Sequence, residues 1–432
     1  MRSARKITGL AAMAALALLA AGCTGGGHGT GQASPAAQAG GASGASARAA
    51  GPRVTITPAN GARDADPAAG ITVTAAGGTL THVTVRTSGD PVPGALSQDG
   101  AVWRSQWALD VSQAYTVTAT ASGHGGGTVT ATSAFRTLAP SQTFTTEILE
   151  GYHQSYGVGM PIILYFSQRI TDKAAVERAL QVTTSTPVVG AWYWDDPCNM
   201  APTCAYFRPR NYWPAGTTVS FTGHLNGVQG APGVYGDHTL TQTFDIGASL
   251  IAIGNTATHR TRIYYNGKLR YDWPISSGRP GDDTPDGSYL TIEKANPVQM
   301  TGPGYSISVP WSVRFTFSGD YYHDAYWSVG EQGFENVSHG CVNLSPADAE
   351  TYYNLAVPGD PITIVGSPKG GAWDNGWTEW FLSWSQYLQG SALHEAVQAG
   401  PDGSTFVDPA TLPPSTASAP LQTAPPGNSA AR

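Results

Sequence analysis

One cysteine of this chain lies among residues that suit nucleophilic chemistry. Residues 338–344 read Ser-His-Gly-Cys-Val-Asn-Leu, and a second histidine, His323, lies a short loop upstream of Cys341. Cysteine attacks as its thiolate, yet a free thiol with a pKa of about 8.5 is mostly protonated at neutral pH. An imidazole must therefore lie beside the sulfur. A strand and a loop can return His323 to Cys341, whereas His339 is only two residues away and its ring need not meet the sulfur even on the same face of a strand.

The glycine before the cysteine fits the same chemistry. Gly340 places no side chain in the path to the sulfur, and its backbone N–H, with that of Cys341, is a candidate donor to a developing oxyanion. We therefore predict an acyl-transfer site with Cys341, His323, His339 and Gly340 as its catalytic residues. An isolated buried cysteine is usually inert packing, and the surrounding motif is what favours catalysis. For His339, shaping the loop and acting directly in the oxyanion site both remain open.

These residues and their spacing resemble the L,D-transpeptidases of the YkuD family. The resemblance runs from His323-Asp324 to Ser338-His339-Gly340-Cys341-Val342-Asn343, and it covers roughly residues 250–390. It extends to three further groups of residues, namely Ser277-Gly278-Arg279, Thr284-Pro285-Asp286-Gly287, and Trp327-Ser328-Val329-Gly330 with Gly333. Relatives often have serine where this chain has Asp324, and that position orients the imidazole through its backbone carbonyl.

The resemblance also implies residues that bind substrate. Met300 and Tyr305 fall where mycobacterial-type enzymes carry a mobile flap, although Tyr305 also suits a cover for the core. Ser338, Asn343 and Asp324 complete the candidate substrate-binding set, with Ser338 and Asn343 expected mainly to fix the loop. A carboxylate at position 324 would also raise the pKa of the neighbouring histidine.

The implied reaction joins peptidoglycan stem peptides. Cys341 would attack the third residue of a tetrapeptide donor, usually meso-diaminopimelate, and release D-alanine. The side-chain amine of another stem would then resolve the thioester as a 3→3 cross-link, with His323 exchanging protons. Carbapenems are expected to acylate Cys341. The alternatives are a Cys/His peptidoglycan hydrolase or L,D-carboxypeptidase, and a non-catalytic wall-binding lipoprotein.

Composition predicts a mainly β protein. The chain has 432 residues, of which 41% are hydrophobic and only 12% are charged. Sparse helix formers and many Gly, Thr, Val and aromatic residues favour β-rich folds with polar, uncharged surfaces. Lysine and arginine number 23 against 30 acidic residues, for a net charge of −7, so no basic patch indicates a nucleic-acid partner. We expect a monomer without metal or cofactor.

The N-terminus carries an export signal. Arg2, Arg5 and Lys6 precede an apolar run that is too short to span a membrane comfortably, which indicates a signal peptide over residues 1–22. Leu19-Ala20-Ala21-Gly22-Cys23 resembles the lipobox of bacterial lipoproteins, and plain secretion is the alternative. Acylation of Cys23 would hold the protein on the outer face of the cytoplasmic membrane, facing the cell wall.

The rest of the chain divides by its turn and strand patterns. Alternating β-runs separated by Gly, Pro and Asp turns predict two immunoglobulin-like β-sandwiches before a mostly antiparallel β catalytic domain, with a short helix after the nucleophile. The predicted segments are a lipidated tether at 23–52, sandwiches at 53–138 and 139–247, a catalytic domain at 248–366, a Trp-rich extension at 367–392, and a disordered tail at 393–432.

Local signals refine this plan. With Cys23 lipidated and Cys341 free, Cys198 and Cys204 remain and are expected to form a disulfide in an oxidising compartment; two cysteines without nearby histidines are too few ligands for zinc. Alternation of Val313, Phe315 and Phe317 predicts one buried face running toward His323. In the C-terminal extension, four tryptophans at helical spacing predict a helix or turn that wedges the catalytic domain against the preceding one.

Overall fold

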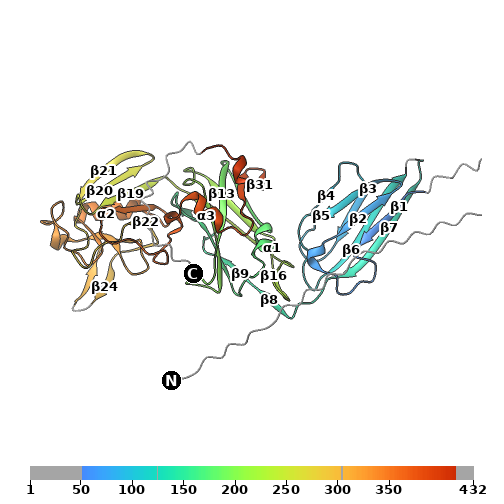
Figure 1. Cartoon of the computed structure of the whole chain (residues 1–432), viewed down its shortest axis with the longest axis horizontal. Helices are drawn as coiled ribbons and strands as arrows, with labels where there is room; N and C mark the ends of the chain where they lie inside the picture. The colour runs from blue at the N-terminus through green and yellow to red at the C-terminus, as the bar shows by residue number, and fades with distance from the viewer. Residues whose placement is uncertain (1–50, 124, 303–304, 415–432) are drawn as a thin grey trace, which may run out of the picture. The chain divides into compact units, whose positions relative to one another are not determined.

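The computed structural model describes residues 51–123, 125–302 and 305–414, and these residues fold mostly as β-strands joined by turns (Figure 1). The predicted mainly β class is therefore confirmed. Among the described residues, no helix combines the length and apolar character needed to cross a membrane. The predicted signal peptide, Cys23 and the tether up to residue 50 lie outside the described residues.

The first predicted sandwich folds as two sheets around one core. Their strand orders are β1-β2-β5-β4 and β3-β6-β7. The strands are β1 Arg53–Thr57, β2 Thr72–Ala76, β3 Gly78–Arg86, β4 Gly94–Leu96, β5 Val102–Ser105, β6 Ala114–Gly123 and β7 Thr128–Arg136. In β6, Tyr115, Val117 and Ala119 are buried and join Val73 of β2 in the core, as the period-two pattern predicts.

The second sandwich is larger and holds most of the aromatic core. Its sheets have the orders β31-β30-β13-β14-β11-β9, β10-β18-β15-β12 and β16-β17-β8. Its strands include β8 Gln142–Phe144, β9 Thr146–Ile148, β10 Ser155–Tyr156, β11 Ile162–Phe166, β12 Leu180–Thr184, β13 Val188–Asp195, β14 Thr203–Pro209, β15 Thr218–Gly223, β16 Gln229–Ala231, β17 Val234–Gly236 and β18 Leu240–Ile246. The sandwich also contains a short helix, α1 Lys173–Arg178. Trp192 and Trp194 are buried in the core of this sandwich rather than displayed for ligands.

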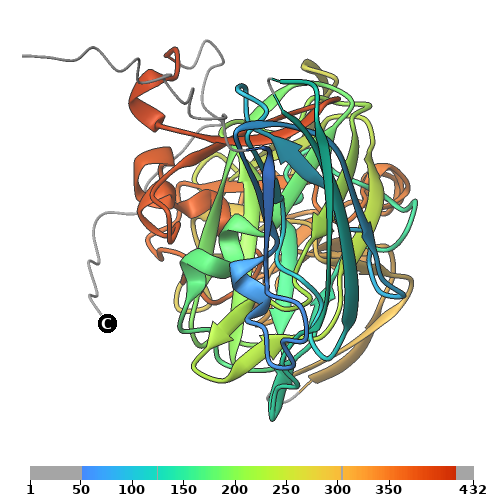
Figure 2. The same ribbon diagram turned by 90° about the vertical axis from the view of Figure 1, so that its right-hand side faces the viewer.

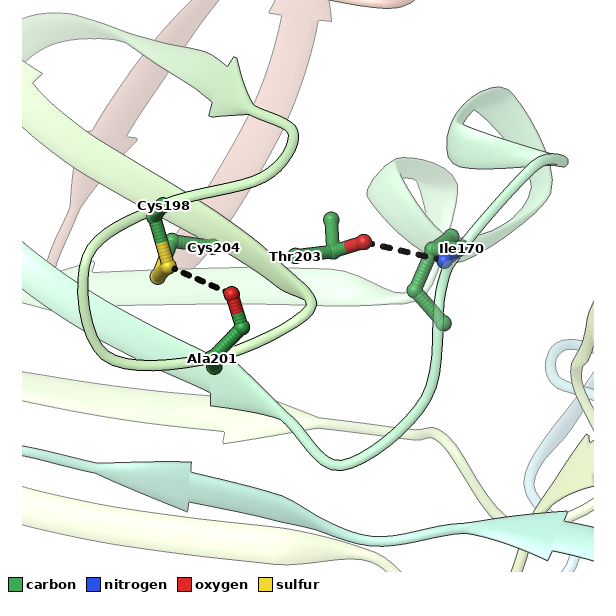
Figure 3. The surroundings of a disulfide bond; sticks show 5 residues. All are labelled: Ile170, Cys198, Ala201, Thr203 and Cys204. Atoms are coloured by element: carbon green, nitrogen blue, oxygen red, sulfur yellow. Dashed lines mark hydrogen bonds between the residues drawn. A yellow bond between two sulfur atoms is a disulfide. The ribbon is translucent and has the colours of Figure 1, made fainter.

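The predicted disulfide joins Cys198 and Cys204 (Figure 3). The bond closes the loop between β13 and β14, where Asp195 lies opposite Cys204 in the antiparallel register. Beside it, Thr203 Oγ1 accepts a hydrogen bond from the Ile170 backbone N–H at 3.1 Å. The disulfide therefore fixes a turn at the end of a buried strand pair.

A third domain carries Cys341. Its two main sheets have the orders β21-β20-β19-β29-β22 and β23-β26-β27-β28, and β24-β25 form a separate hairpin. The elements are β19 Leu250–Asn255, β20 Arg260–Tyr265, β21 Lys268–Pro274, β22 Gly287–Leu290, β23 Glu293–Ala295, β24 Val298–Gly302, β25 Tyr305–Val309, β26 Ser312–Arg314, β27 Tyr321–Asp324, β28 Val342–Leu344, α2 Pro346–Leu355 and β29 Pro361–Val365. Most strand pairs are antiparallel, and the exceptions in this domain are β19 with β29 and β27 with β28.

Two short sequence patterns in this domain explain a tight turn and the start of a helix. The β20–β21 hairpin turns at Asn266 and Gly267, whose φ angles of 48° and 76° suit a type I′ turn. Helix α2 begins as predicted after Ser345, whose side chain accepts a hydrogen bond from the Asp348 backbone N–H, with Pro346 in the first turn. The helix starts immediately after the Cys341 strand, so its cap fixes the end of that strand.

Phe317 corrects the predicted buried face. Val313 and Phe315 are fully buried, but Phe317 is 39% exposed. The alternation fails because β26 ends at Arg314 and the chain turns before β27 begins. The turn places a polar segment, rather than a third buried aromatic, immediately before the histidine strand.

The C-terminus corrects the predicted tail. Residues 396–407 form two strands, β30 Ala396–Gly400 and β31 Gly403–Val407, and β30 pairs with β13 of the second sandwich (Figure 1, Figure 2). Val397 and Ala399 are buried there, and this burial outweighs the polar composition around them. Residues 415–432 lie outside the described residues.

The Trp-rich extension is not one helix. It contains a 3₁₀ turn η3, Glu379–Phe381, and a short helix α3, Trp384–Gln389, which packs beside β13. Gly376, with φ of 135°, lies in the turn that precedes them. The wedge is confirmed, because Trp380 Nε1 donates to Gly159 O at 2.8 Å while the Phe381 ring lies 5.0 Å from that of Tyr289 in the third domain.

Candidate active site

Two parallel strands carry the predicted nucleophile and base on one face. In the β27–β28 register, Tyr322 pairs with Val342 and His323 pairs with Asn343. Tyr322 and Val342 are fully buried in the core, so the alternate residues belong to the opposite face. Cys341 lies immediately before Val342 and thus shares that opposite face with His323, offset by two positions on the neighbouring strand.

The His323 ring is held in one orientation. Its Nδ1 lies 2.8 Å from the Asp324 backbone oxygen, and the residue is only 3% exposed. Because that carbonyl can only accept, Nδ1 carries the proton and Nε2 is left with its lone pair. Burial lowers the pKa of His323 to about 4, and the carbonyl contact opposes this shift. The ring is therefore neutral at physiological pH, and the expected raising of its pKa by the Asp324 carboxylate is wrong because burial dominates.

The thiol is neutral as well. Cys341 is partly exposed, and its Sγ lies 3.7 Å from the Gly319 carbonyl, within the range of a weak S–H donor. Burial and the neighbouring Asp320 carboxylate raise the pKa of Cys341 to about 12, while the Tyr321 backbone N–H opposes that shift. A neutral thiol beside a neutral imidazole can react only if the proton leaves as the bond forms, which is general-base catalysis.

Hydrogen bonds fix the nucleophile loop from within. Ser338 Oγ donates to Cys341 O at 2.6 Å and accepts from the Gly340 backbone N–H at 3.1 Å. Gly340 has a φ of 130°, and a Cβ there would lie 2.4 Å from Asp320 Oδ1, so glycine is required for two separate reasons. The predicted loop-fixing role of Ser338 thus has a direct structural basis.

A second segment supports the loop from outside. Thr284 Oγ1 donates to Gly340 O at 2.6 Å and accepts from the Gly278 backbone N–H at 2.9 Å. The backbone of Ser276 exchanges two hydrogen bonds with that of Asn343, and Asn343 Nδ2 donates to Ser328 Oγ at 2.9 Å. The outlying motif residues of the sequence therefore converge on the loop that presents Cys341.

Three further predicted site residues lie on the nucleophile loop and on a neighbouring hairpin. His339 is exposed at the loop surface. Met300 lies on β24 opposite Ile307, and Tyr305 is the first residue of β25, so both belong to the β24–β25 hairpin. The base of this hairpin contacts the histidine strand, because the Asp324 backbone N–H donates to Pro310 O at 3.2 Å. The hairpin is thus anchored beside the base.

Sequence reasoning overlooked the turn before β27. Asp320 and Gly319 both face Cys341, one as a charge and the other as a carbonyl acceptor. A signal existed, since a Ser-Gly-Asp turn occupies residues 318–320 directly before the histidine strand. The alternating pattern through Phe317 instead predicted that the strand continues to that residue, which left no place for this turn.

Comparisons with known proteins agree with this site. Residues 250–364 match the model of the L,D-transpeptidase catalytic domain, and residues 62–229 match that of a bacterial Ig domain. L,D-transpeptidase 5 of Mycobacterium tuberculosis is 36% identical over 355 residues, which span 79% of this chain and 77% of the relative. The chain belongs to the L,D-transpeptidase family. Cross-linking of peptidoglycan is the role of this family, and its members use a catalytic cysteine.

Other L,D-transpeptidases show the same similarity. L,D-transpeptidase 2 of M. tuberculosis is 32% identical over 353 residues, covering 79% of this chain and 85% of the relative. A solved structure of the L,D-transpeptidase LdtMt1 in complex with imipenem is 33% identical; the match covers 51% of this chain and 97% of that one, with a TM-score of 0.42.

Proposed function

We propose that this L,D-transpeptidase forms 3→3 cross-links between peptidoglycan stem peptides through a thioester on Cys341. The observation that supports the proposal is the register of β27 and β28, in which His323 and Cys341 belong to one face of neighbouring strands, two positions apart, in a chain of this family. The donor is a tetrapeptide stem, and the acceptor is the amine on the third residue of a second stem, of the diaminopimelate type.

Acylation follows from the protonation states of the two residues. His323 Nε2 accepts the thiol proton as Sγ bonds to the carbonyl carbon of the third stem residue. The peptide bond to the terminal D-alanine then breaks, and His323 returns the proton to the departing amine. Because the Gly340 N–H already donates to Ser338 Oγ, we assign oxyanion stabilisation first to the Cys341 N–H, with His339 at the surface of the same loop.

Deacylation reverses these roles. The acceptor amine attacks the thioester carbon, and His323 transfers a proton from the amine nitrogen to the departing sulfur. We assign contact with the bound stem to the β24–β25 hairpin, which carries Met300 and Tyr305; the support is that its base lies against the histidine strand. Asp324 serves through its carbonyl, and Ser338 and Asn343 keep the loop in shape.

The test is direct product analysis. Residues 53–432 are incubated with tetrapeptide muropeptides, and wild type is expected to release D-alanine and form dimers, whereas Cys341→Ala is expected to do neither. A carbapenem, whose strained acyl group suits thiol attack, is expected to add its mass to wild type and not to Cys341→Ala. Cleaved stems without dimers would indicate a hydrolase or carboxypeptidase, and dimers formed by Cys341→Ala would exclude the proposed nucleophile.

We further propose that the enzyme acts as a monomer on the outer face of the cytoplasmic membrane. Support comes from the N-terminal sequence, in which basic residues and an apolar run precede Cys23. Acylation at Cys23 would tether the folded domains within reach of the wall. Cells expressing the full chain are expected to incorporate a labelled fatty acid into it, and Cys23→Ala is expected to abolish the label. Equal labelling of both proteins would rule out this anchor.

A further inference from the structure

A carboxylate lies against the nucleophile loop, on the turn that leads into β27. Asp320 Oδ2 accepts hydrogen bonds from Thr316 Oγ1 at 2.8 Å and from Ser318 Oγ at 3.2 Å. Its Oδ1 lies 2.4 Å from the position that a Cβ on Gly340 would occupy. One carboxylate oxygen is thus tied into the turn, and the other faces the residue that precedes Cys341.

The cations near Asp320 do not cancel the effect of its carboxylate on the pKa of the Cys341 thiol. Burial raises the pKa of Asp320, while the two hydroxyls, Lys369 and Arg314 oppose that shift. Arg314 is already engaged, since its guanidinium donates to Glu293 Oε1 at 2.8 Å and to the backbone oxygens of Thr316 and Phe317. The Tyr289 hydroxyl and the Cys341 thiol are the titratable groups whose pKa values Asp320 raises. A negative charge beside a nucleophilic thiol opposes ionisation of that thiol. Activation of Cys341 is therefore not the role of Asp320, and another role must explain its position.

We propose that Asp320 is a specificity-determining residue that binds the ammonium group of the amine acceptor beside the Cys341 thioester. The inference rests on the proposed function, because it concerns the second half of that reaction. An alkyl amine with a pKa of about 10 arrives as a cation. A partly buried carboxylate attracts this cation strongly, and it offers a water molecule no comparable advantage. Asp320 would therefore favour aminolysis over hydrolysis of the same thioester.

Aminolysis of the thioester removes two protons from the bound ammonium group. The bound ammonium gives one proton to solvent, and the freed lone pair on nitrogen attacks the thioester carbon. The carbon–sulfur bond breaks, and His323 transfers the second proton from nitrogen to sulfur. The products are an amide and a neutral Cys341 thiol. Asp320 holds the amine before and during deprotonation and forms no covalent bond.

The same geometry has a consequence that needs no substrate. In the free enzyme, the Asp320 charge disfavours the Cys341 thiolate, so removing it should make the thiol more reactive toward a neutral alkylating agent. Asp320→Asn removes the charge while keeping an oxygen that Thr316 and Ser318 can hydrogen-bond. Asp320→Glu keeps the charge on a longer side chain, and Asp272→Asn removes an exposed carboxylate from β21, remote in sequence, as the matched control.

The experiment compares these variants in the two-sandwich catalytic chain, residues 53–432. The first measurement is the pH dependence of iodoacetamide alkylation of Cys341, and the second is the ratio of amide to hydrolysed product from tetrapeptide muropeptides. Cys341 of the Asp320→Asn variant is expected to be alkylated faster at pH 8 than that of wild type. The ratio of amide to hydrolysed product is expected to fall by about 10-fold, as loss of one charge-assisted contact implies. Asp320→Glu is expected to retain most of the ratio, and Asp272→Asn to match wild type in both measurements.

Other results of this experiment would contradict either the role of Asp320 or the proposed function. An unchanged product ratio in Asp320→Asn, with dimers still formed by wild type, overturns the role of Asp320 and leaves the proposed function intact. Acylation of wild type without any amide product overturns the proposed function and this inference with it. Faster alkylation with an unchanged ratio limits Asp320 to tuning the thiol and rejects amine binding. If Asp320→Asn does not fold, Asp320→Ser makes the same comparison.

Discussion

Replacing His323 by alanine is expected to slow thioester formation by about 10²- to 10⁴-fold at pH 7, the range typical of a lost general base. The reason is the protonation state of the Cys341 thiol. With its pKa raised to about 12 by burial and by Asp320, Cys341 has almost no thiolate at this pH, so attack depends on proton removal by the neighbouring imidazole. The measurement is the rate of D-alanine release from a tetrapeptide muropeptide in a single turnover. His82→Ala, which changes an exposed histidine on β3 of the first sandwich, is the control.

The pH dependence of kcat/KM in wild type tests the same role of His323. Burial lowers the pKa of His323 to about 4, so the free-enzyme ring keeps its accepting lone pair well below pH 6.5. The acid limb of kcat/KM is therefore expected to fall as the pH drops through about 4, and His323→Ala is expected to lose this limb. Full activity in His323→Ala, or a wild-type acid limb that stays at the ordinary histidine value near 6.5, would show that His323 is not the base in this environment.

The sequence predicted this pair because two kinds of information coincided. The motif around Cys341 identified the nucleophile, and the distance back to His323 required a strand and a turn between them, which the β27–β28 pairing provides. Parallel register then places both residues on the face opposite the core. The capped helix after Ser345 and the Asn266-Gly267 hairpin were also predictable, since each depends on backbone preferences of a few adjacent residues.

What the sequence did not reveal depends on contacts between distant segments. Asp320 matters because its carboxylate meets Gly340, and no local pattern reports that approach. The strand at residues 396–400 forms because an edge of the second sandwich, about two hundred residues earlier, accepts it through β13. Phe317 kept the alternating pattern of its neighbours while a turn removed it from their strand. In each case tertiary context outweighed a correct local pattern.

The second sandwich and the Trp-rich extension packed on it each contain a buried carboxyl group, and the two groups tie stability to pH. Glu150 is 1% exposed, and only its Oε2 has a partner, the Ile163 backbone N–H at 3.3 Å. Glu379, on η3 of the Trp-rich extension, is 4% exposed, and its Oε2 has no hydrogen-bond partner among the residues that the structure describes. Burial raises the pKa of Glu150 to about 8 and that of Glu379 to about 7, and the two carboxyls repel each other when charged.

Among the described residues, the cation that favours the charged form of Glu379 is Arg208. Arg208 is fully buried with its guanidinium 4.3 Å from the Trp380 ring and 4.2 Å from that of Tyr387, and it lowers the pKa of Glu379. Burial lowers the pKa of Arg208 itself to about 10, so it remains charged at neutral pH. Its charge opposes the rise in the pKa of Glu379 but does not cancel it, because burial is the larger cause.

Glu150→Gln is therefore expected to stabilise the protein at alkaline pH and not at acid pH. A carboxyl whose folded-state pKa lies above its unfolded value favours folding below about pH 4.5, and this contribution is lost as the pH rises through about 8. Each pH unit in that window costs about 1.4 kcal/mol per group, so the free energy of unfolding of Glu150→Gln, relative to that of wild type, should rise by about 5 kcal/mol between pH 4.5 and pH 8.5. Glu379→Gln should show a smaller gain, with its window ending near pH 7.

Urea unfolding followed by tryptophan fluorescence at pH 4.5 and at pH 8.5 measures these differences. Glu147→Gln is the matched control, because Glu147 lies on the same stretch of chain and is exposed. Substituting Glu150 and Glu379 together should flatten the pH dependence further than either change alone, since each carboxyl raises the cost of ionising the other. Equal stability of Glu150→Gln and wild type at pH 8.5 would mean that the Glu150 carboxylate finds solvent or a cation on ionising, and that the η3 contact with the second sandwich opens to admit it.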